Sequence, residues 1–247
     1  MTAPLFLLPS GALADAAVGA DLLLEGAEGR HAATVRRIAP GERVDLADGA
    51  GAVARCTVLA AARDALTLRV DELGTEPQPT PRLVLVQALA KGDRDDLAVE
   101  AATELGVDEV VPWQAARSVV VWKGERGERA RRKWEQTVRA AAKQSRRARV
   151  PEVAALASSA DVRARVGTAA LAVVLHEEAT TPLAGLPLPE AGEVLLVVGP
   201  EGGITAEELA GFEAAGAVAC RLGPQVLRSS TAGPAALAVL SAAGRWR

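Results

Sequence analysis

Long apolar runs in the second half of the chain constrain the fold most. The stretches RLVLVQAL at 82–89, ALAVVL at 170–175 and EVLLVV at 193–198 are apolar at nearly every position, which is typical of strands buried on both faces. Helical patterns such as residues 93–106 separate them. Apolar strands that alternate with helices predict an α/β domain whose parallel sheet is covered on both sides.

The first helix of this domain is expected to present Leu97, Ala101 and Leu105 on one apolar face. A further strand, VDEVVPW at 107–113, follows it, and a basic helix is predicted at about 126–148.

The first 75 residues have a different pattern. Short alternating runs separated by Gly and Asp turns predict a small β-barrel or sandwich, with a hairpin turn at DGAG, residues 48–51. The stretch GTEPQPTPR, residues 74–82, has three prolines in nine positions and little to bury, so it predicts an interdomain linker. We therefore expect domains at 1–74 and 82–247.

Composition excludes several classes of protein. Aromatic residues make up only 2% of the 247 residues, which argues against broad stacking of single-stranded bases. Cys56 and Cys220 with two histidines give neither a disulfide framework nor a zinc spacing, so we expect no metal and a reduced, cytoplasmic compartment. The apolar start lacks a basic region and is interrupted by Pro9, so we interpret it as a strand, not a signal peptide or membrane span.

One segment carries much of the positive charge. The chain has a net charge of −3, yet residues 123–149 contain eleven Lys or Arg against three Glu. These side chains cannot all share one helix face, so part of the run is a solvated helix, with Trp134 and Val138 marking its buried side. The local excess on an acidic protein favours contact with phosphate groups.

Three predicted strands end in unusual sequence motifs: LHEE at 175–178, GPEGG at 199–203 and LGPQVLRSSTAGPAAL at 222–237. Parallel sheets bind ligands at the carboxyl ends of their strands, so these loops are expected to form one pocket.

The GPEGG segment precedes Thr205, which with Glu208 predicts a capping box and a helix start. The segment has neither G-x-G-x-x-G nor G-x-x-x-x-G-K-[ST], and Glu201 would repel phosphate. A cationic or hydroxyl-bearing ligand suits it better, although GPEGG alone is equally compatible with an ordinary strand-to-helix turn.

Taken together and in order, these segments resemble the SPOUT class of methyltransferases and, more closely, the RsmE family of 16S ribosomal RNA uridine-N3 methyltransferases. The resemblance covers roughly residues 83–242 and also includes HAATVRR at 31–37. Its motifs are KGDR at 91–94, ATELGV at 102–107, Pro112 with RSVV at 117–120, AAKQSRRARVPE at 141–152, and the three strand ends above.

The resemblance implies an N-terminal PUA-like β-barrel followed by a SPOUT α/β domain with a C-terminal deep trefoil knot. It also implies S-adenosylmethionine (SAM) as the cofactor, a homodimer, and 16S ribosomal RNA or the assembled small subunit as the substrate. The family's cofactor pocket falls on these positions: Leu175, His176, Gly199, Glu201, Gly202, Gly203, Leu222, Gly223, Val226, Leu227 and Thr231.

Arg228 is the first candidate for stabilising negative charge on the base, and Glu201 is a weaker candidate for accepting its proton. Arg228 could equally be a structural ion-pair partner, and a structural or cofactor-wall role suits His176 better than that of a base. The family often has Glu where this chain has Ser230, so a Glu there is not a required base. The candidate RNA contacts are His31, Arg36, Arg37, Lys91, Arg94, Arg117, Lys143, Arg146, Arg147 and Arg149.

Two other functions fit parts of the pattern. The knot motifs alone also allow a SPOUT ribose 2′-O methyltransferase. A non-catalytic RNA-binding or ribosome-assembly protein would keep the fold without turnover.

Overall fold

The computed structural model describes residues 3–246, which form two compact units. The first unit takes the chain up to Gln78 together with Ala142–Val150, and the second takes Pro79–Ala141 and the chain from Pro151 onward. The linker pattern at 74–82 predicts only where one domain ends and the next begins along the chain. It does not predict that the later segment Ala142–Val150 packs with the N-terminal unit.

A five-stranded sheet forms the N-terminal unit, with the order β1-β3-β4-β5-β2. All pairs are antiparallel except β1 with β3. The predicted turn at 48–51 joins β3 to β4, where the carboxylate of Asp48 accepts hydrogen bonds from the Ala50 and Ala52 amides at 2.8 and 3.1 Å. The strands are β1 Leu5–Leu7, β2 Asp21–Leu24, β3 Arg43–Ala47, β4 Ala52–Ala61 and β5 Leu66–Thr75.

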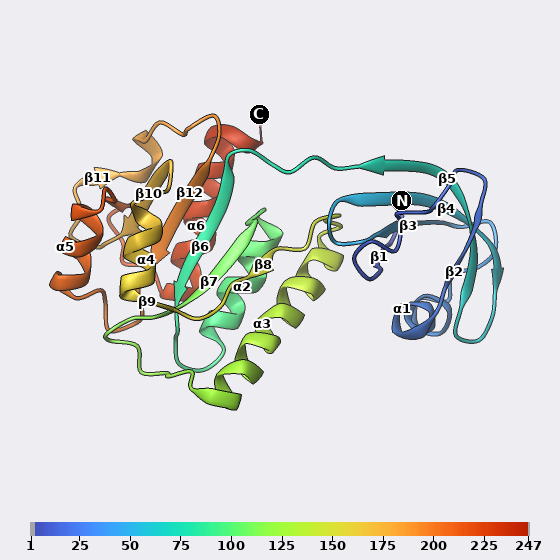
Figure 1. The fold of residues 1–247 in the computed structure, drawn as a ribbon, viewed down its shortest axis with the longest axis horizontal. Coiled ribbons are helices and arrows are strands. Elements are labelled where there is room, and N and C mark those ends of the chain that lie inside the picture. The colour runs from blue at the N-terminus through green and yellow to red at the C-terminus, as the bar shows by residue number, and fades with distance from the viewer. Residues whose placement is uncertain (1–2, 247) are drawn as a thin grey trace. The chain divides into compact units, whose positions relative to one another are not determined.

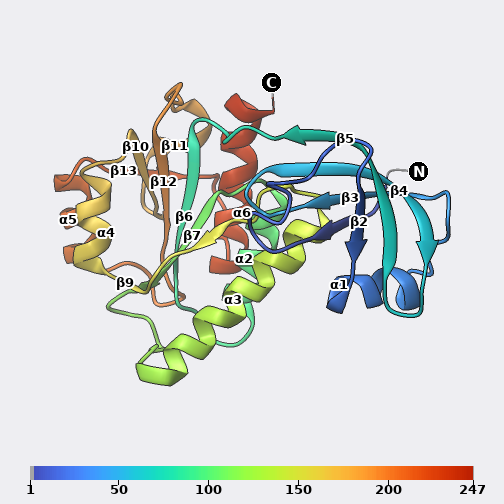
Figure 2. The same cartoon turned by 45° about the vertical axis from the view of Figure 1, so that its right-hand side comes forward.

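A short helical segment, α1 Gly26–Arg30 continuing into the π-helical turn η1 His31–Val35, lies against the turn between β4 and β5 (Figure 2). A Cβ on Gly29 would come within 2.7 Å of the Asp64 carbonyl oxygen, so only glycine allows this approach.

The second unit contains a fully parallel sheet, as predicted, with the order β11-β13-β10-β12-β6-β7-β8 and β9 paired to β7 (Figure 1). The central strands coincide with the apolar runs of the sequence. The strands are β6 Arg82–Ala88, β7 Glu109–Gln114, β8 Glu152–Val153, β9 Ala157–Ser158, β10 Leu171–Leu175, β11 Thr181–Pro182, β12 Glu193–Val198 and β13 Val218–Arg221.

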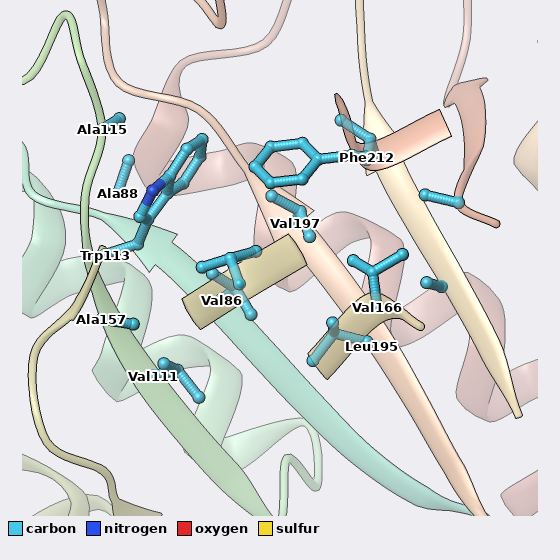
Figure 3. Packing of buried hydrophobic residues seen from close by; sticks show 14 of the residues in the cluster. Val86, Ala88, Val111, Trp113, Ala115, Ala157, Val166, Leu195, Val197 and Phe212 are labelled. Atoms are coloured by element: carbon cyan, nitrogen blue, oxygen red, sulfur yellow. The ribbon is translucent and has the colours of Figure 1, made fainter. Parts of the chain in front are cut away.

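Helices cover both faces of this sheet. On one face Trp113 of β7 and Phe212 of α5 meet edge to face at 5.5 Å, above Val86 and Val197 (Figure 3). On the other face Gly233 of α6 lies against Leu85. The helices are α2 Arg94–Glu104, α3 Gly124–Gln144, α4 Ser159–Val166, α5 Ala206–Ala214 and α6 Ser229–Leu240, with short turns η2 Leu183–Gly185 and η3 Ser241–Arg245.

The predicted apolar face of α2 is wrong. Leu97 is 55% exposed, whereas Ala98, Val99 and Ala102 are fully buried. Helix α2 packs on α6 and β6, and small side chains let helix and sheet approach closely. The burial of small residues, not the position of the leucines, sets the orientation of this helix.

Charged side chains cluster at the amino ends of the central strands. The guanidinium of Arg165 bonds both carboxylate oxygens of Glu109 at 2.6 Å and also binds Glu193, and Arg82 bridges to Glu109 at 2.9 Å. The hydrogen bonds that its guanidinium donates to these carboxylates raise the pKa of Arg165 above its usual range. This network stabilises the edge of the sheet opposite the strand ends that carry the unusual motifs.

No helix within residues 3–246 is long and apolar enough to span a bilayer. The trefoil knot implied by the resemblance stays a prediction.

Candidate functional site

A pocket of about 710 Å³ lies at the carboxyl ends of β10, β12 and β13, where the three strand-end motifs of the sequence converge as predicted. Arg228, Arg94 and Arg117 line it as well. Thr231 lies in the first turn of α6 and is not among the lining residues. The candidate cofactor residues that do line the pocket are Leu175, His176, Gly199, Glu201, Gly202, Gly203, Leu222, Gly223, Val226 and Leu227.

The glycines of the 199–203 loop are required for packing within the unit. A Cβ on Gly199 would lie 2.6 Å from Cγ1 of Ile204, and one on Gly202 would lie 3.1 Å from the Cβ of Arg117. Gly203 has a φ of +75°, which L side chains adopt only with strain. The loop therefore folds closely on its surroundings, and its backbone forms a wall of the pocket.

Glu201 points to another strand end. Its Oε1 accepts hydrogen bonds from the Lys91 amide at 3.1 Å and from the Arg94 guanidinium at 2.9 Å. Burial alone would raise its pKa, but backbone hydrogen bonds and the Arg94 guanidinium hold the pKa below the usual value. Glu201 is thus an anchored carboxylate, and a lowered pKa makes it a poorer proton acceptor.

Glu208 makes the predicted capping box with Thr205 and also reaches beyond it. Its Oε2 accepts from the Thr205 amide and hydroxyl, while its Oε1 accepts from the Ala116 amide at 2.8 Å and the Ser159 hydroxyl at 2.7 Å. Burial alone would raise its pKa, but these hydrogen bonds lower it overall. One carboxylate therefore joins the start of α5, the start of α4 and the segment after β7.

Arg228 and Ser229 mark the start of α6 at the pocket. Arg228 is the N-cap residue, and its carbonyl accepts from the amides of Thr231 and Ala232. Its side chain is exposed and forms no ion pair within residues 3–246. The hydroxyl of Ser229 is buried without a hydrogen-bond partner in the described chain. Sequence reasoning missed Ser229, although its place after Arg228 at a helix start was a usable signal.

His176 continues β10 at the pocket wall. Its amide donates to the Cys220 carbonyl at 2.9 Å, and its Nδ1 accepts from the Glu178 amide at 3.3 Å. Both bonds fix the turn after β10. They fit the wall role that the sequence favours for His176.

Several candidate RNA contacts also interact with other residues of the protein. Lys143 pairs with Glu28 at 2.6 Å and lies over the Phe6 ring, and Arg149 donates to the carbonyls of Glu76 and Pro77. His31 packs edge to face on Phe6. These contacts indicate structural roles in the N-terminal unit.

Other basic candidates remain accessible. Arg36, Arg37 and Arg146 are exposed, and the side chain of Lys91 is exposed although its amide binds Glu201. Arg147 is half-buried.

Helix α3 carries an arginine stripe that the candidate RNA contacts did not include. We use this name for Arg126, Arg129 and Arg132, which are exposed and recur every three residues along one side of the helix. Trp134 and Val138 are buried on the other side, as predicted. Arg131 and Lys133, by contrast, pair with Glu135 and Asp96.

Within residues 3–246 no three His, Cys, Asp or Glu side chains come together in a way that could hold a metal ion.

The fold and pocket define a class: a small β domain joined to an α/β domain that binds its ligand at the carboxyl end of a parallel sheet, as in the SPOUT RNA methyltransferases. The family model described as RNA methyltransferase domain matches residues 76–241, and the one described as RNA methyltransferase PUA domain matches residues 24–71.

Curated relatives narrow the class. The chain is 48% identical to the ribosomal RNA small subunit methyltransferase E of Mycobacterium tuberculosis over 233 residues, covering 92% of this chain and 89% of that protein. It is 30% identical to the Bacillus subtilis protein of the same name, covering 88% of each. The chain belongs to the ribosomal RNA small subunit methyltransferase E family.

Solved structures agree with this assignment. A Neisseria gonorrhoeae ribosomal RNA small subunit methyltransferase E bound to SAM matches with a TM-score of 0.83 and 26% identity, over 98% of both chains. A Legionella pneumophila methyltransferase in complex with SAM matches with a TM-score of 0.85, also at 26% identity and 98% coverage of both chains.

Proposed function

We propose that this chain transfers a methyl group from SAM to N3 of a uridine in the RNA of the small ribosomal subunit. Membership of the family supports the reaction class and the substrate. The observation that carries the proposal is the convergence of the three strand-end motifs on one pocket.

The pocket suits SAM in size and chemistry. Its volume lies in the usual range for small-molecule sites. Leu175, Leu222 and Leu227 offer apolar surface for an adenine ring, and the glycine loop offers backbone groups for hydrogen bonds. Glu177 and Glu178 add negative charge to the lining, which is compatible with a cationic sulfonium. When bound there, SAM supplies the methyl group as an electrophile.

The residues at the start of α6 would handle the uracil. Removing the N3 proton places negative charge on the imide and its two carbonyl oxygens. The guanidinium of Arg228 and the positive end of the α6 dipole can stabilise that charge. Most of the rate gain would come from holding the two reactants in line. Glu201 is better suited to positioning than to proton acceptance because Arg94 binds it.

The RNA backbone would contact exposed arginines and the N-terminal unit. The arginine stripe of α3 offers three accessible guanidinium groups, and the match to a PUA domain of RNA methyltransferases supports RNA binding by residues 24–71. Arg36 and Arg37 are exposed within that range.

We further propose a homodimer acting in the cytoplasm. Val226 is 74% exposed at the rim of the pocket beside Leu227, which leaves apolar surface that a second copy could cover. Sedimentation equilibrium tests this: a mass near that of one 25.4 kDa chain would contradict it.

Primer extension tests the reaction itself. N3 methylation blocks the Watson–Crick edge of uridine, so reverse transcriptase should stop at one position on small-subunit RNA from the wild-type strain and read through in a deletion strain. An unchanged pattern, with no transfer of labelled methyl from SAM to 30S subunits, refutes the proposal. Label transfer without any stop would indicate ribose methylation.

A further inference from the structure

Two arginines that the sequence assigns to RNA make hydrogen bonds to the pocket's glycine loop. Arg94 follows β6 and binds the Glu201 carboxylate at 2.9 Å, and Arg117 follows β7 and donates to the Gly202 carbonyl at 3.1 Å. The amide of Lys91 adds a bond to Glu201 at 3.1 Å. The segments that follow β6 and β7 thus hold two successive residues of one loop, Glu201 and Gly202.

The strand order explains how both arginines reach the loop. Strand β12, which the loop follows, lies between β10 on one side and β6 then β7 on the other. The two arginines come from the β6 and β7 side, whereas the opposite pocket wall is formed by the segments that follow β10 and β13. The loop is therefore held from one side, opposite the wall formed by Leu175 and Leu222.

Close packing reinforces the hold at Arg117. The backbone of Gly202 lies so near that an added Cβ would be 3.1 Å from the Arg117 Cβ and 3.2 Å from its carbonyl oxygen. The preceding residue, Ala116, is itself fixed by the hydrogen bond that its backbone amide donates to the Glu208 carboxylate. Arg117 thus extends from an anchored backbone. A side chain that only binds phosphate groups does not require such an anchor.

We propose that Arg94 and Arg117 are positioning residues that preorder the 199–203 loop for SAM, and that neither is primarily an RNA contact. This inference rests on the proposed function, because it takes SAM as the ligand of the pocket. A loop fixed before binding loses less conformational freedom when the ligand arrives, so these bonds act on SAM affinity.

The test is the double variant R94A/R117A, with R94K/R117K as the conservative pair. Titration calorimetry should give a dissociation constant for SAM about five- to tenfold higher for the alanine pair, since partly exposed charged hydrogen bonds are worth less than buried ones. The lysine pair should recover most of the affinity. Affinity for transcribed 16S ribosomal RNA, and its salt dependence, should stay within twofold.

Two further measurements separate positioning from general destabilisation. Amide hydrogen exchange of the 199–203 loop, recorded without SAM, should speed up in the alanine pair, while exchange in the β6 and β7 strands should not. Arg55→Ala, which removes an exposed ion pair with Glu72 in the other unit, should leave SAM affinity unchanged.

A change in SAM affinity of less than twofold in R94A/R117A overturns the inference, and a simultaneous drop in RNA affinity would assign the two arginines to RNA. If the double variant fails to fold, each single variant is judged by the same criterion. If the unaltered chain binds no SAM, the proposed function fails, yet the exchange measurement still shows whether the arginines order the loop.

Discussion

Replacing Glu208 should destabilise the second unit and loosen its pocket at once. This carboxylate is 9% exposed and accepts four hydrogen bonds, from the Ala116 amide, the Ser159 hydroxyl, and the amide and hydroxyl of Thr205. Glu208→Ala leaves two backbone N–H groups without this acceptor. Glu208→Gln keeps one acceptor oxygen but removes the charge.

The size of the effect follows from those contacts. Thr205 still caps the amide of residue 208, so losing the Glu208 half of the capping box costs up to about 1 kcal/mol, and losing the hydrogen bonds from the Ala116 amide and the Ser159 hydroxyl to this charged group costs about 1.5–3 kcal/mol. A total near 3 kcal/mol corresponds to a fall in melting temperature of roughly 6–12 °C for a unit of this size. We expect Glu208→Gln to lose about half as much.

The effect should also depend on pH. The folded-state pKa of Glu208 lies below the ordinary 4.5, so its ionised form stabilises the fold above that value and the stabilisation is lost as pH falls through the folded pKa. The difference between wild type and Glu208→Gln should therefore be full at pH 7 and shrink progressively below about pH 4.5.

Differential scanning calorimetry from pH 7 to pH 3 measures both quantities. Glu207→Ala is the matched control, because Glu207 is the exposed neighbour in the same helical turn. A shift of less than 2 °C for Glu208→Ala at pH 7, or a Gln difference that does not change with pH, would refute the reasoning.

Three further predictions concern the loop, the RNA and a buried acid. Gly202→Ala should weaken SAM binding at least tenfold by calorimetry, because the new methyl would press on Arg117 at 3.1 Å; unchanged binding would show that the loop can yield. Replacing all three arginines of the stripe by Gln should lower the slope of log K for RNA binding against log[salt] by about 2, at about 0.7 per phosphate contact, with SAM affinity unaltered; an unchanged slope would remove the stripe from the interface. Burial, and then the charge of Asp96, raises the pKa of Asp95 to about 6, so its ionisation destabilises the fold as pH rises above the ordinary 3.8 through 6. Asp95→Asn should add up to about 3 kcal/mol of stability at pH 7 and almost none at pH 4 in thermal melts, and equal effects at both would contradict the assignment.

Much of the fold could be predicted because its signals are local. The apolar runs, the Thr205 capping box and the turn at 48–51 depend on residues that are neighbours in sequence, and each forms as expected. The convergence of three strand ends follows from a general property of parallel sheets. The partners of charged side chains depend instead on tertiary packing. Neither the bond from Arg149 to Glu76 nor that from Arg94 to Glu201 has any sequence signature.

The pocket's glycines show how a correct motif can have a different physical cause. The sequence suggests that Gly199 tolerates the restriction imposed by Pro200, and that Gly202 and Gly203 lack a side chain so that a ligand can touch the backbone. In the structure the missing Cβ atoms of Gly199 and Gly202 make room for Ile204 and Arg117. A loop packed this closely has few conformations left to lose on binding, and its amides and carbonyls are aimed before the ligand arrives. Under the proposed function, glycine would serve SAM affinity by ordering the loop before SAM binds. Substitutions of Arg94 and Arg117, which hold the loop, should therefore change SAM binding indirectly.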